Sequence, residues 1–232
     1  MMSVSMRRST GQIAILALFL AGCTPVQTRD TAPGPPPPQN VVGSTDELQL
    51  VVELSLDLAR QHGGDRILVA LDVDNTLLAA GPEACTGDWP NGAPTTVQPD
   101  AAKHVSRMQE AGLRVIAVSS RDAGCFQRTE EQLNGNGLDF GASAWPSKGM
   151  AQAGTPPLLY RDGILLGSGS DRGRMVTQLL EHSDGEQPVL IVLADERQAN
   201  LNAVMKAFSF SNTKVHAWRY TRDAGVAVSS ID

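Results

Sequence analysis

Two carboxylates stand two residues apart at the end of an apolar run in this sequence. The run Ile67-Leu-Val-Ala-Leu71 is followed directly by Asp72-Val-Asp74-Asn-Thr76. Such a run predicts a buried strand, and open α/β sheets bind ligands at the C-terminal ends of their strands. Two acids at this spacing repel each other unless a cation lies between them, and a divalent metal prefers oxygen ligands. The pair therefore predicts metal-assisted chemistry on an anionic substrate.

Two further apolar runs end in polar side chains. Ser119-Ser120-Arg121 follows residues 113–118, and Asp195-Glu196 follows residues 189–194. If these runs are parallel strands, their C-terminal ends lie at the same edge of one sheet. We therefore expect these side chains to converge with Asp72, although they are far apart along the chain.

The remaining sequence supplies the elements that must position these side chains. A first helix is expected from the capping box Ser44-x-x-Glu47 to His62. Periodicity predicts further helices at 99–111, 126–134, 173–182 and 198–207, and strands at 66–71, 113–118, 189–194 and 214–218. Residues 158–166 are read as a hairpin that turns at Asp162-Gly163. Strand–helix alternation is typical of a mainly parallel sheet covered by helices on both faces.

Composition limits the classes of protein that fit. The 232 residues are 41% hydrophobic and 19% charged, which suits one globular domain with processing and linker segments. The formal net charge of −6 argues against nonspecific nucleic-acid binding, because that binding needs a basic surface. The loop 79–98 and the stretch 138–170 are short for a large lid, so we expect a minimal cap and an open site.

The N-terminus predicts export. Arg7-Arg8 precede the apolar stretch Ile13–Ala21, which is too short to span a bilayer and reads as a signal peptide over residues 1–22. Its end, Leu20-Ala-Gly-Cys23, resembles a bacterial lipoprotein signal. That resemblance implies that Cys23 carries acyl chains such as palmitate, which anchor the protein to a membrane. An ordinary signal peptide followed by a chance cysteine is the plainer alternative.

Residues 23–43 then form a Pro-rich tether, and residues 44–232 form the domain. Lipidation places the domain in the bacterial cell envelope, facing the periplasm, and Thr24 favours the outer membrane. Cys85 and Cys125 would lie in an oxidising compartment, where a disulfide between them is possible but not decided by the sequence.

These motifs together resemble the haloacid dehalogenase (HAD)-like superfamily, and most closely a little-characterised family of small bacterial HAD-like lipoproteins. Asp72-x-Asp74-x-Thr76 is similar to the first motif of the superfamily, and Ser119 to the second. Asp195-Glu196 and the later Asn200 match the fourth, and Arg172 stands where the third motif has a Lys. The resemblance implies a Rossmannoid three-layer α/β sandwich with a mainly parallel sheet and a minimal cap.

The resemblance also implies a Mg²⁺-dependent phosphomonoester hydrolase acting on a phosphorylated small molecule or polymer. In the resembled phosphatases, Asp72 would attack phosphorus, and Asp74 would protonate the leaving oxygen and then deprotonate water. Ser119, Ser120 and Arg172 would bind the phosphate. By the same resemblance, Asp72, the backbone carbonyl of Asp74 and Asp195 would bind the metal, and Glu196 would hold its water ligands.

Each role has a plainer alternative. Asp74 and Thr76 can cap a turn, and Asp195-Glu196 can begin a solvated helix. Arg121 reads mainly as a surface residue or as one behind the substrate site, and Lys148 competes with Arg172 for the third-motif role. For the whole protein, the alternatives are a catalytically inactive envelope binding protein and a phosphotransferase with a non-water acceptor.

Overall fold

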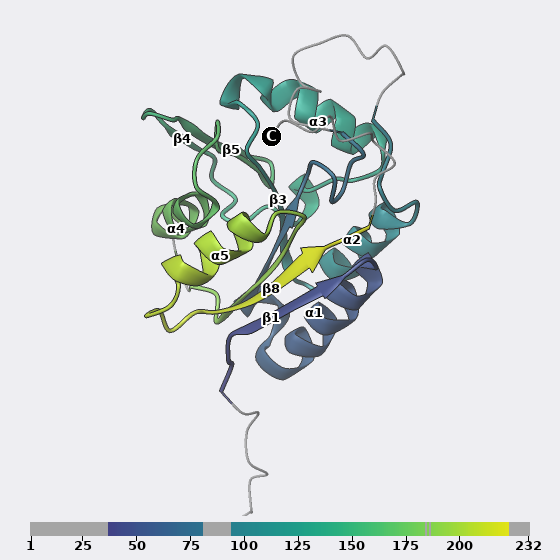
Figure 1. The fold of residues 1–232 in the computed structure, drawn as a ribbon, viewed down its shortest axis with the longest axis vertical. Coiled ribbons are helices and arrows are strands. Elements are labelled where there is room, and N and C mark those ends of the chain that lie inside the picture. The colour runs from purple at the N-terminus through teal and green to yellow at the C-terminus, as the bar shows by residue number, and fades with distance from the viewer. Residues whose placement is uncertain (1–36, 81–93, 184, 186, 223–232) are drawn as a thin grey trace, which may run out of the picture. The chain divides into compact units, whose positions relative to one another are not determined.

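The architecture is one mixed β-sheet with helices on both faces (Figure 1). The computed structural model describes residues 37–80, 94–183, 185 and 187–222. The strands are β1 (Val41–Thr45), β2 (Ile67–Asp72), β3 (Arg114–Ser119), β4 (Met150–Gln152), β5 (Leu158–Arg161), β6 (Ile164–Leu166), β7 (Leu190–Asp195) and β8 (Lys214–Tyr220). Their order is β1-β8-β7-β2-β3-β6-β5-β4. Neighbours from β1 to β6 in this order are parallel, and β5 and β4 continue the sheet in antiparallel pairs.

Helices of the described chain form a layer on each side of the sheet. They are α1 (Leu48–His62), α2 (Ala101–Glu110), α3 (Phe126–Gly135), α4 (Arg172–His182) and α5 (Gln198–Ala207). Figure 1 shows α1 and α2 on one side and α4 and α5 on the other. The apolar side chains of α3 belong to the same core as those of α1 and α2. The predicted three-layer α/β sandwich with a mainly parallel sheet is confirmed.

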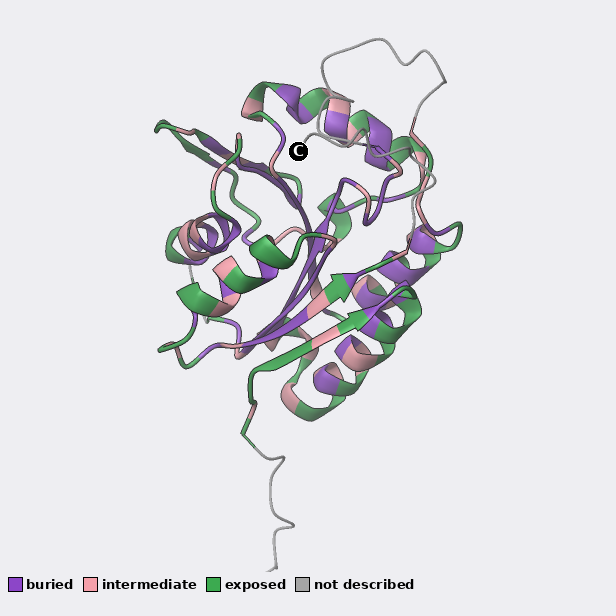
Figure 2. Cartoon of the chain, viewed as in Figure 1, coloured by how far each residue is buried: buried purple, intermediate pink, exposed green. Residues whose placement is uncertain are grey.

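Strand β2 lies at the centre and is buried along its whole length, as the purple central strands in Figure 2 show. Ile67, Val69 and Leu71 pack in the core under α1, α2 and α3. Leu68 and Ala70 pack under α4 and α5. This alternation follows from the period of two in a strand, and burial on both faces explains the continuous apolar run in the sequence.

Several predicted elements are confirmed. The four later helices and four main strands form within a few residues of their predicted bounds. The predicted hairpin is β5–β6, and its turn residues Asp162 and Gly163 have φ of 48° and 75°. Positive φ at both central residues matches the right-handed twist of the two strands.

The predicted start of the domain is wrong. Ser44 belongs to β1, which pairs with β8, so Val41–Gly43 are part of the sheet rather than of the tether. Helix α1 begins only at Leu48, and Thr45 Oγ1 accepts a hydrogen bond from the Glu47 N–H at 3.0 Å. The strand escaped detection because it is short and its Val42 side chain is exposed, so the sequence carries no burial pattern there. The edge strand β4 was missed for the same reason.

Several predictions fall outside the described residues. They are the signal peptide 1–22, the lipidated Cys23, the tether up to residue 36, and most of the loop 79–98. Within the described part of the chain, none of the helices has the length and apolar character needed to cross a membrane.

Candidate functional site

The order of the strands brings the three polar strand ends together. Strand β2 lies between β7 and β3, so Asp72 is flanked by Asp195 on one side and Ser119 on the other. After β6 the chain passes through α4 to β7, on the opposite side of β2 from β3. Ligands of open α/β sheets bind where the strand order reverses in this way.

Three carboxylates form a cluster at this edge. Asp72, Asp195 and Glu196 each offer an oxygen, and these oxygens lie within 4.8 Å of one another. Asp72 and Asp195 are buried and Glu196 is half-buried. Among the residues that the structure describes, Asp72 Oδ2 and Glu196 Oε2 are buried and have no hydrogen-bond partner. These two atoms are therefore available to a cation.

Arg172 bridges two members of this acidic cluster. Its side chain is 2% exposed. Arg172 Nη2 donates to Asp72 Oδ1, and its Nε lies 3.2 Å from Asp195 Oδ2. Arg172 is the first residue of α4, and the Asp171 side chain caps this helix by accepting from the Arg174 N–H at 3.0 Å. The cation predicted for the third motif thus contacts both acids directly.

Asp195 is oriented from the other side by the start of α5. Asn200 Nδ2 lies 2.9 Å from each Asp195 oxygen. The Arg197 N–H donates to Asp195 Oδ1 at 2.9 Å, and Arg197 Nε donates to Glu196 Oε1 at 3.1 Å. The spacing Asp195-Glu196…Asn200, noted in the sequence, therefore corresponds to a real contact.

Asp74 lies in a different environment, next to a second arginine. Arg121 Nη2 donates to Asp74 Oδ1 at 2.7 Å, and Arg121 Nε lies 3.2 and 3.1 Å from Oδ1 and Oδ2. Arg121 is 1% exposed. Of the two predicted positions of Arg121, the one on the surface is wrong, because its charge is buried against Asp74. The position behind the substrate site agrees with this contact.

Helix α3 holds the far end of Arg121. Its Nη1 donates to Gln132 Oε1 at 2.6 Å and to Thr129 Oγ1 at 3.1 Å. Thr129 and Gln132 lie on the buried face of α3 together with Phe126. We missed these residues in the sequence. Polar side chains on the inner face of a predicted helix were the signal that could have revealed them.

Ser119 and Ser120 lie beside Asp74, at the end of β3. Ser119 is fully buried, and its Oγ donates to Asp74 Oδ2 at 3.3 Å and accepts from the Arg121 N–H at 3.1 Å. The carbonyl of Ser120 accepts from the Gly169 N–H at 2.8 Å, which ties β3 to the loop before α4. Phosphate binding by the two hydroxyls stays a prediction.

Burial shifts the ionisation of the acidic cluster. Burial raises the pKa of Asp72 well above its ordinary value, and the charge of Asp195 raises it further while Arg172 opposes the shift. Burial also raises the pKa of Glu196. Both shifts disfavour the charged carboxylates, because burial removes these groups from water.

A divalent cation suits this cluster. When ionised, the three carboxylates carry three negative charges, and Arg172 and the more exposed Arg197, which pairs with Glu196, supply two positive ones. One negative charge then remains for the cation to balance. The donors are carboxylate oxygens, which Mg²⁺ prefers, and two of them have no other partner. Asp72, Asp195 and Glu196 could therefore hold a divalent metal ion, whereas the Asp74 side chain is occupied by Arg121.

Lys148, the alternative to Arg172 for the third motif, is exposed before β4. Arg172 is the one of the two that contacts the acids. Cys125 is disulfide-bonded. Cys85, the partner considered in the sequence, lies outside the described residues, so the pairing that the sequence left undecided stays open.

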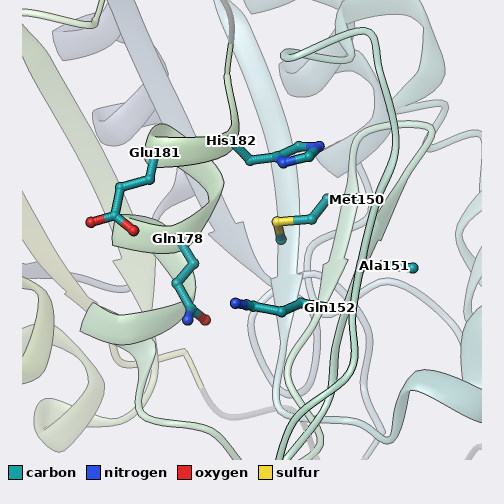
Figure 3. Close-up of a pocket in the computed structure, with 6 residues that line it drawn as sticks. All are labelled: Met150, Ala151, Gln152, Gln178, Glu181 and His182. Carbon is teal, nitrogen blue, oxygen red and sulfur yellow. The ribbon is translucent and has the colours of Figure 1, made fainter.

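A separate pocket of about 240 Å³ lies between β4 and α4. Figure 3 shows Gln152 and Gln178 entering it from these two elements. Glu181 and His182 line it at the C-terminal end of α4, whereas Arg172 stands at the N-terminal end of that helix. The pocket is therefore distinct from the acidic cluster.

Fold and site together define an α/β protein with an acidic, arginine-bridged site at the carboxyl edge of a parallel sheet. The chain belongs to the family described as "Protein of unknown function (DUF2608)", whose model matches residues 92–225. The matched segment contains Ser119, Arg121, Arg172 and Asp195 and begins after Asp72 and Asp74. No curated protein matches the chain.

Proposed function

We propose that this protein is a Mg²⁺-dependent phosphomonoester hydrolase of the HAD-like superfamily, anchored in the bacterial cell envelope. The observation that carries the proposal is the cluster of Asp72, Asp195 and Glu196, bridged by Arg172 and retaining unpartnered carboxylate oxygens. Such a cluster suits a cation, and a cation beside a buried carboxylate suits an anionic substrate.

Each residue of the site has its own role in the proposed hydrolysis. Asp72 attacks phosphorus, the bond to the leaving oxygen breaks, and an aspartyl-phosphate forms. Water then attacks phosphorus, the bond to Asp72 breaks, and Asp74 accepts the proton of the water. Bound Mg²⁺ would neutralise the carboxylates that face the phosphate. Ser120 donates to a phosphate oxygen, the Ser119 hydroxyl stays on Asp74 Oδ2, and Arg172 stabilises the negative charge that develops.

The test uses the full-length chain purified in detergent. We expect Mg²⁺-dependent release of phosphate from 4-nitrophenyl phosphate or from a panel of nucleotides and sugar phosphates. Asp72→Asn should abolish it, because the amide is not a nucleophile, whereas Asp57→Asn on the exposed side of α1 should not change it. Failure of every substrate, with Asp72→Asn identical to the parent, would rule the hydrolase out.

One observation favours a non-catalytic binding protein instead. Arg172 and Arg121 pair with Asp72, Asp195 and Asp74, so arginine charges of the chain itself balance part of the acidic charge. If the arginines alone balance the acids and the site binds no metal, Mg²⁺ should not raise the melting temperature of the protein. A rise that disappears in Asp195→Asn supports the metal site and the hydrolase.

The envelope location rests on the N-terminal sequence. Lipidation at Cys23 would add acyl chains, each buried CH₂ contributing about 0.8 kcal/mol to membrane binding. Labelling of cells with radioactive palmitate should mark the parent chain and leave Cys23→Ala unlabelled. If the parent protein is not labelled, the lipid anchor must be dropped from the proposal, whereas the proposed hydrolase activity is unaffected.

A further inference from the structure

Strand β4 ends the sheet, and within the described chain no strand pairs with its outer edge (Figure 1). The tight turn after Arg161 makes Arg161 and Ile164 a hydrogen-bonded pair. Backbone groups alternate in direction along a strand, so Leu159 also directs its N–H and C=O toward β6. Its partner in β4 is Ala151, which therefore lies in a non-hydrogen-bonded pair. The N–H and C=O of Ala151 point to the free edge.

The pocket of about 240 Å³ between β4 and α4 lies on one side of this strand. Met150 and Gln152 flank Ala151 in the chain and line the pocket, so both side chains face α4. A strand added at the free edge places the residues opposite Met150 and Gln152 on the same face of the sheet. An extended peptide that pairs with Ala151 therefore directs alternate side chains toward the pocket.

The pocket offers acceptors to such a side chain. Gln178 Oε1 is buried and has no hydrogen-bond partner among the described residues, and Figure 3 shows the Gln178 amide directed toward Gln152. Glu181, three residues later and thus a neighbour of Gln178 on the helix surface, is exposed and has no ion pair within the described chain. Neither Lys nor Arg lines the pocket. A carboxylate near the C-terminal end of a helix favours a cation, and a buried acceptor favours a donor.

We propose that the free edge of β4 binds an extended segment of a partner protein by strand addition, and that the pocket selects a lysine of this segment. Ala151 supplies main-chain hydrogen bonds, and Gln178 and Glu181 accept from the ammonium group. Lysine suits this role because its four-carbon stem carries a compact charge with three donors. The pocket lies at the opposite end of α4 from Arg172. The proposal therefore goes beyond the hydrolase and does not depend on it.

The experiment measures the fluorescence anisotropy of a fluorescein-labelled peptide, Thr-Lys-Val-Lys-Thr-amide, titrated with the full-length protein in a nonionic detergent. Its two lysines lie on one face of an extended strand. Salt at about 0.15 M screens the long-range attraction of a cationic peptide to the acidic chain. In the comparison peptide, norleucine replaces both lysines, which keeps the stem and removes the ammonium. We expect the lysine peptide to bind about tenfold more tightly, because hydrogen bonds to charged groups are stronger than neutral ones.

Variants test the pocket and the edge separately. Glu181→Gln should weaken binding of the lysine peptide by about threefold, as for an exposed ion pair, and leave the norleucine peptide unchanged. Glu110→Gln, an exposed acid at the end of α2, is the matched control and should change neither affinity. Ala151→Pro removes the outward N–H and should abolish binding of both peptides. Edge strands tolerate proline where the N–H faces solvent, and Glu181→Gln tests the proposal even if this variant does not fold.

A preference for the lysine peptide that Glu181→Gln reduces and Glu110→Gln keeps supports the proposal. Equal affinity for the two peptides overturns it, and so does an equal effect of the two glutamate variants, which would indicate nonspecific attraction to an acidic surface. Binding of free n-butylamine as tight as that of the lysine peptide also overturns it, because strand addition then contributes nothing. Turnover of phosphate esters is not measured, so loss of the hydrolase proposal would leave these outcomes unaffected.

Discussion

Two buried arginines hold the acidic side chains at the carboxyl edge of the sheet. Arg172 reaches Asp72 and Asp195 from α4, and Arg121 reaches Asp74 from the end of β3 with support from α3. The two cations thus serve different acids. This separation leaves Asp72 in the acidic cluster and Asp74 in a buried ion pair of its own.

Replacing Arg172 should show how much this cation contributes to the stability of a fold that buries Asp72 and Asp195. Arg172→Met leaves two buried carboxylates without their partner, so the free energy of unfolding should fall by about 3–5 kcal/mol. Mg²⁺ should restore part of this loss by replacing the missing charge. Urea denaturation with and without Mg²⁺ measures both effects.

Arg107→Met is the control for that experiment. Arg107 forms an exposed pair with Glu53 at 2.9 Å, and the loss of such a pair changes stability by about 1 kcal/mol or less. If Arg172→Met and Arg107→Met lower the free energy of unfolding equally, the contacts of Arg172 do not stabilise the fold.

At the scale of elements, close packing of α4 against α5 places Arg172. Gly173 makes this possible, because a Cβ at this position would lie 2.5 Å from the Ala203 carbonyl oxygen. Helix α5 also carries Asn200, which orients Asp195. The contact between the two helices therefore fixes both partners of the acidic cluster.

Gly173→Ala should disturb that contact. Overpacking should lower the free energy of unfolding by about 1–3 kcal/mol and displace Arg172, so that phosphatase activity falls as well. Gly135→Ala in α3 is the matched control, since nothing lies within 4 Å of its added Cβ and Ala favours the helix. A harmless Gly173→Ala would contradict this account of how Arg172 is placed.

Strand β1 is the second element whose role can be tested. Beside its pairing with β8, the Asn40 side chain accepts from the Val215 N–H at 2.9 Å. A protein beginning at residue 44 lacks these contacts, and a loss of about 2 kcal/mol would lower its melting temperature by roughly 4–8 °C relative to one beginning at residue 37. Equal melting temperatures would mean that β1 contributes nothing to stability.

At the scale of the whole molecule, pH should act on the junction between β8 and the residues before β1. Burial lowers the pKa of His216, and its Nε2 lies 3.0 Å from the Gln39 carbonyl oxygen. The unfolded chain therefore binds a proton more readily than the folded one. Stability from this group is complete above the ordinary pKa of 6.5 and is lost as the pH falls below it.

The pH dependence can be assigned with one variant. The free energy of unfolding, measured between pH 7.5 and roughly pH 5 around the ordinary range of histidine, should fall with pH in the parent. His216→Gln should show a smaller fall over the same range. His182→Gln, at an exposed position at the end of α4, serves as the control, and an unchanged slope in His216→Gln would refute the assignment.

The sequence by itself determined the sheet, its covered faces and the acidic ends of its strands. Buried parallel strands must be apolar, so the runs before Asp72, Ser119 and Asp195 marked them directly. Because successive side chains of a strand point to opposite faces of the sheet, alternate residues pack in the cores on its two sides. Position next to a strand end was enough to nominate Asp72, Asp74 and Asp195.

Only the tertiary structure decided which charges meet. The pairing of Arg121 with Asp74 joins residues 47 positions apart, and that of Arg172 with Asp72 joins residues 100 apart. Long, flexible arginine side chains reach several Å from their backbone, so their position in the sequence does not show which acid they bind. Strand β1 could not be predicted for a related reason. Backbone hydrogen bonds to β8 hold it in place, and such bonds do not depend on the pattern of side chains in the sequence.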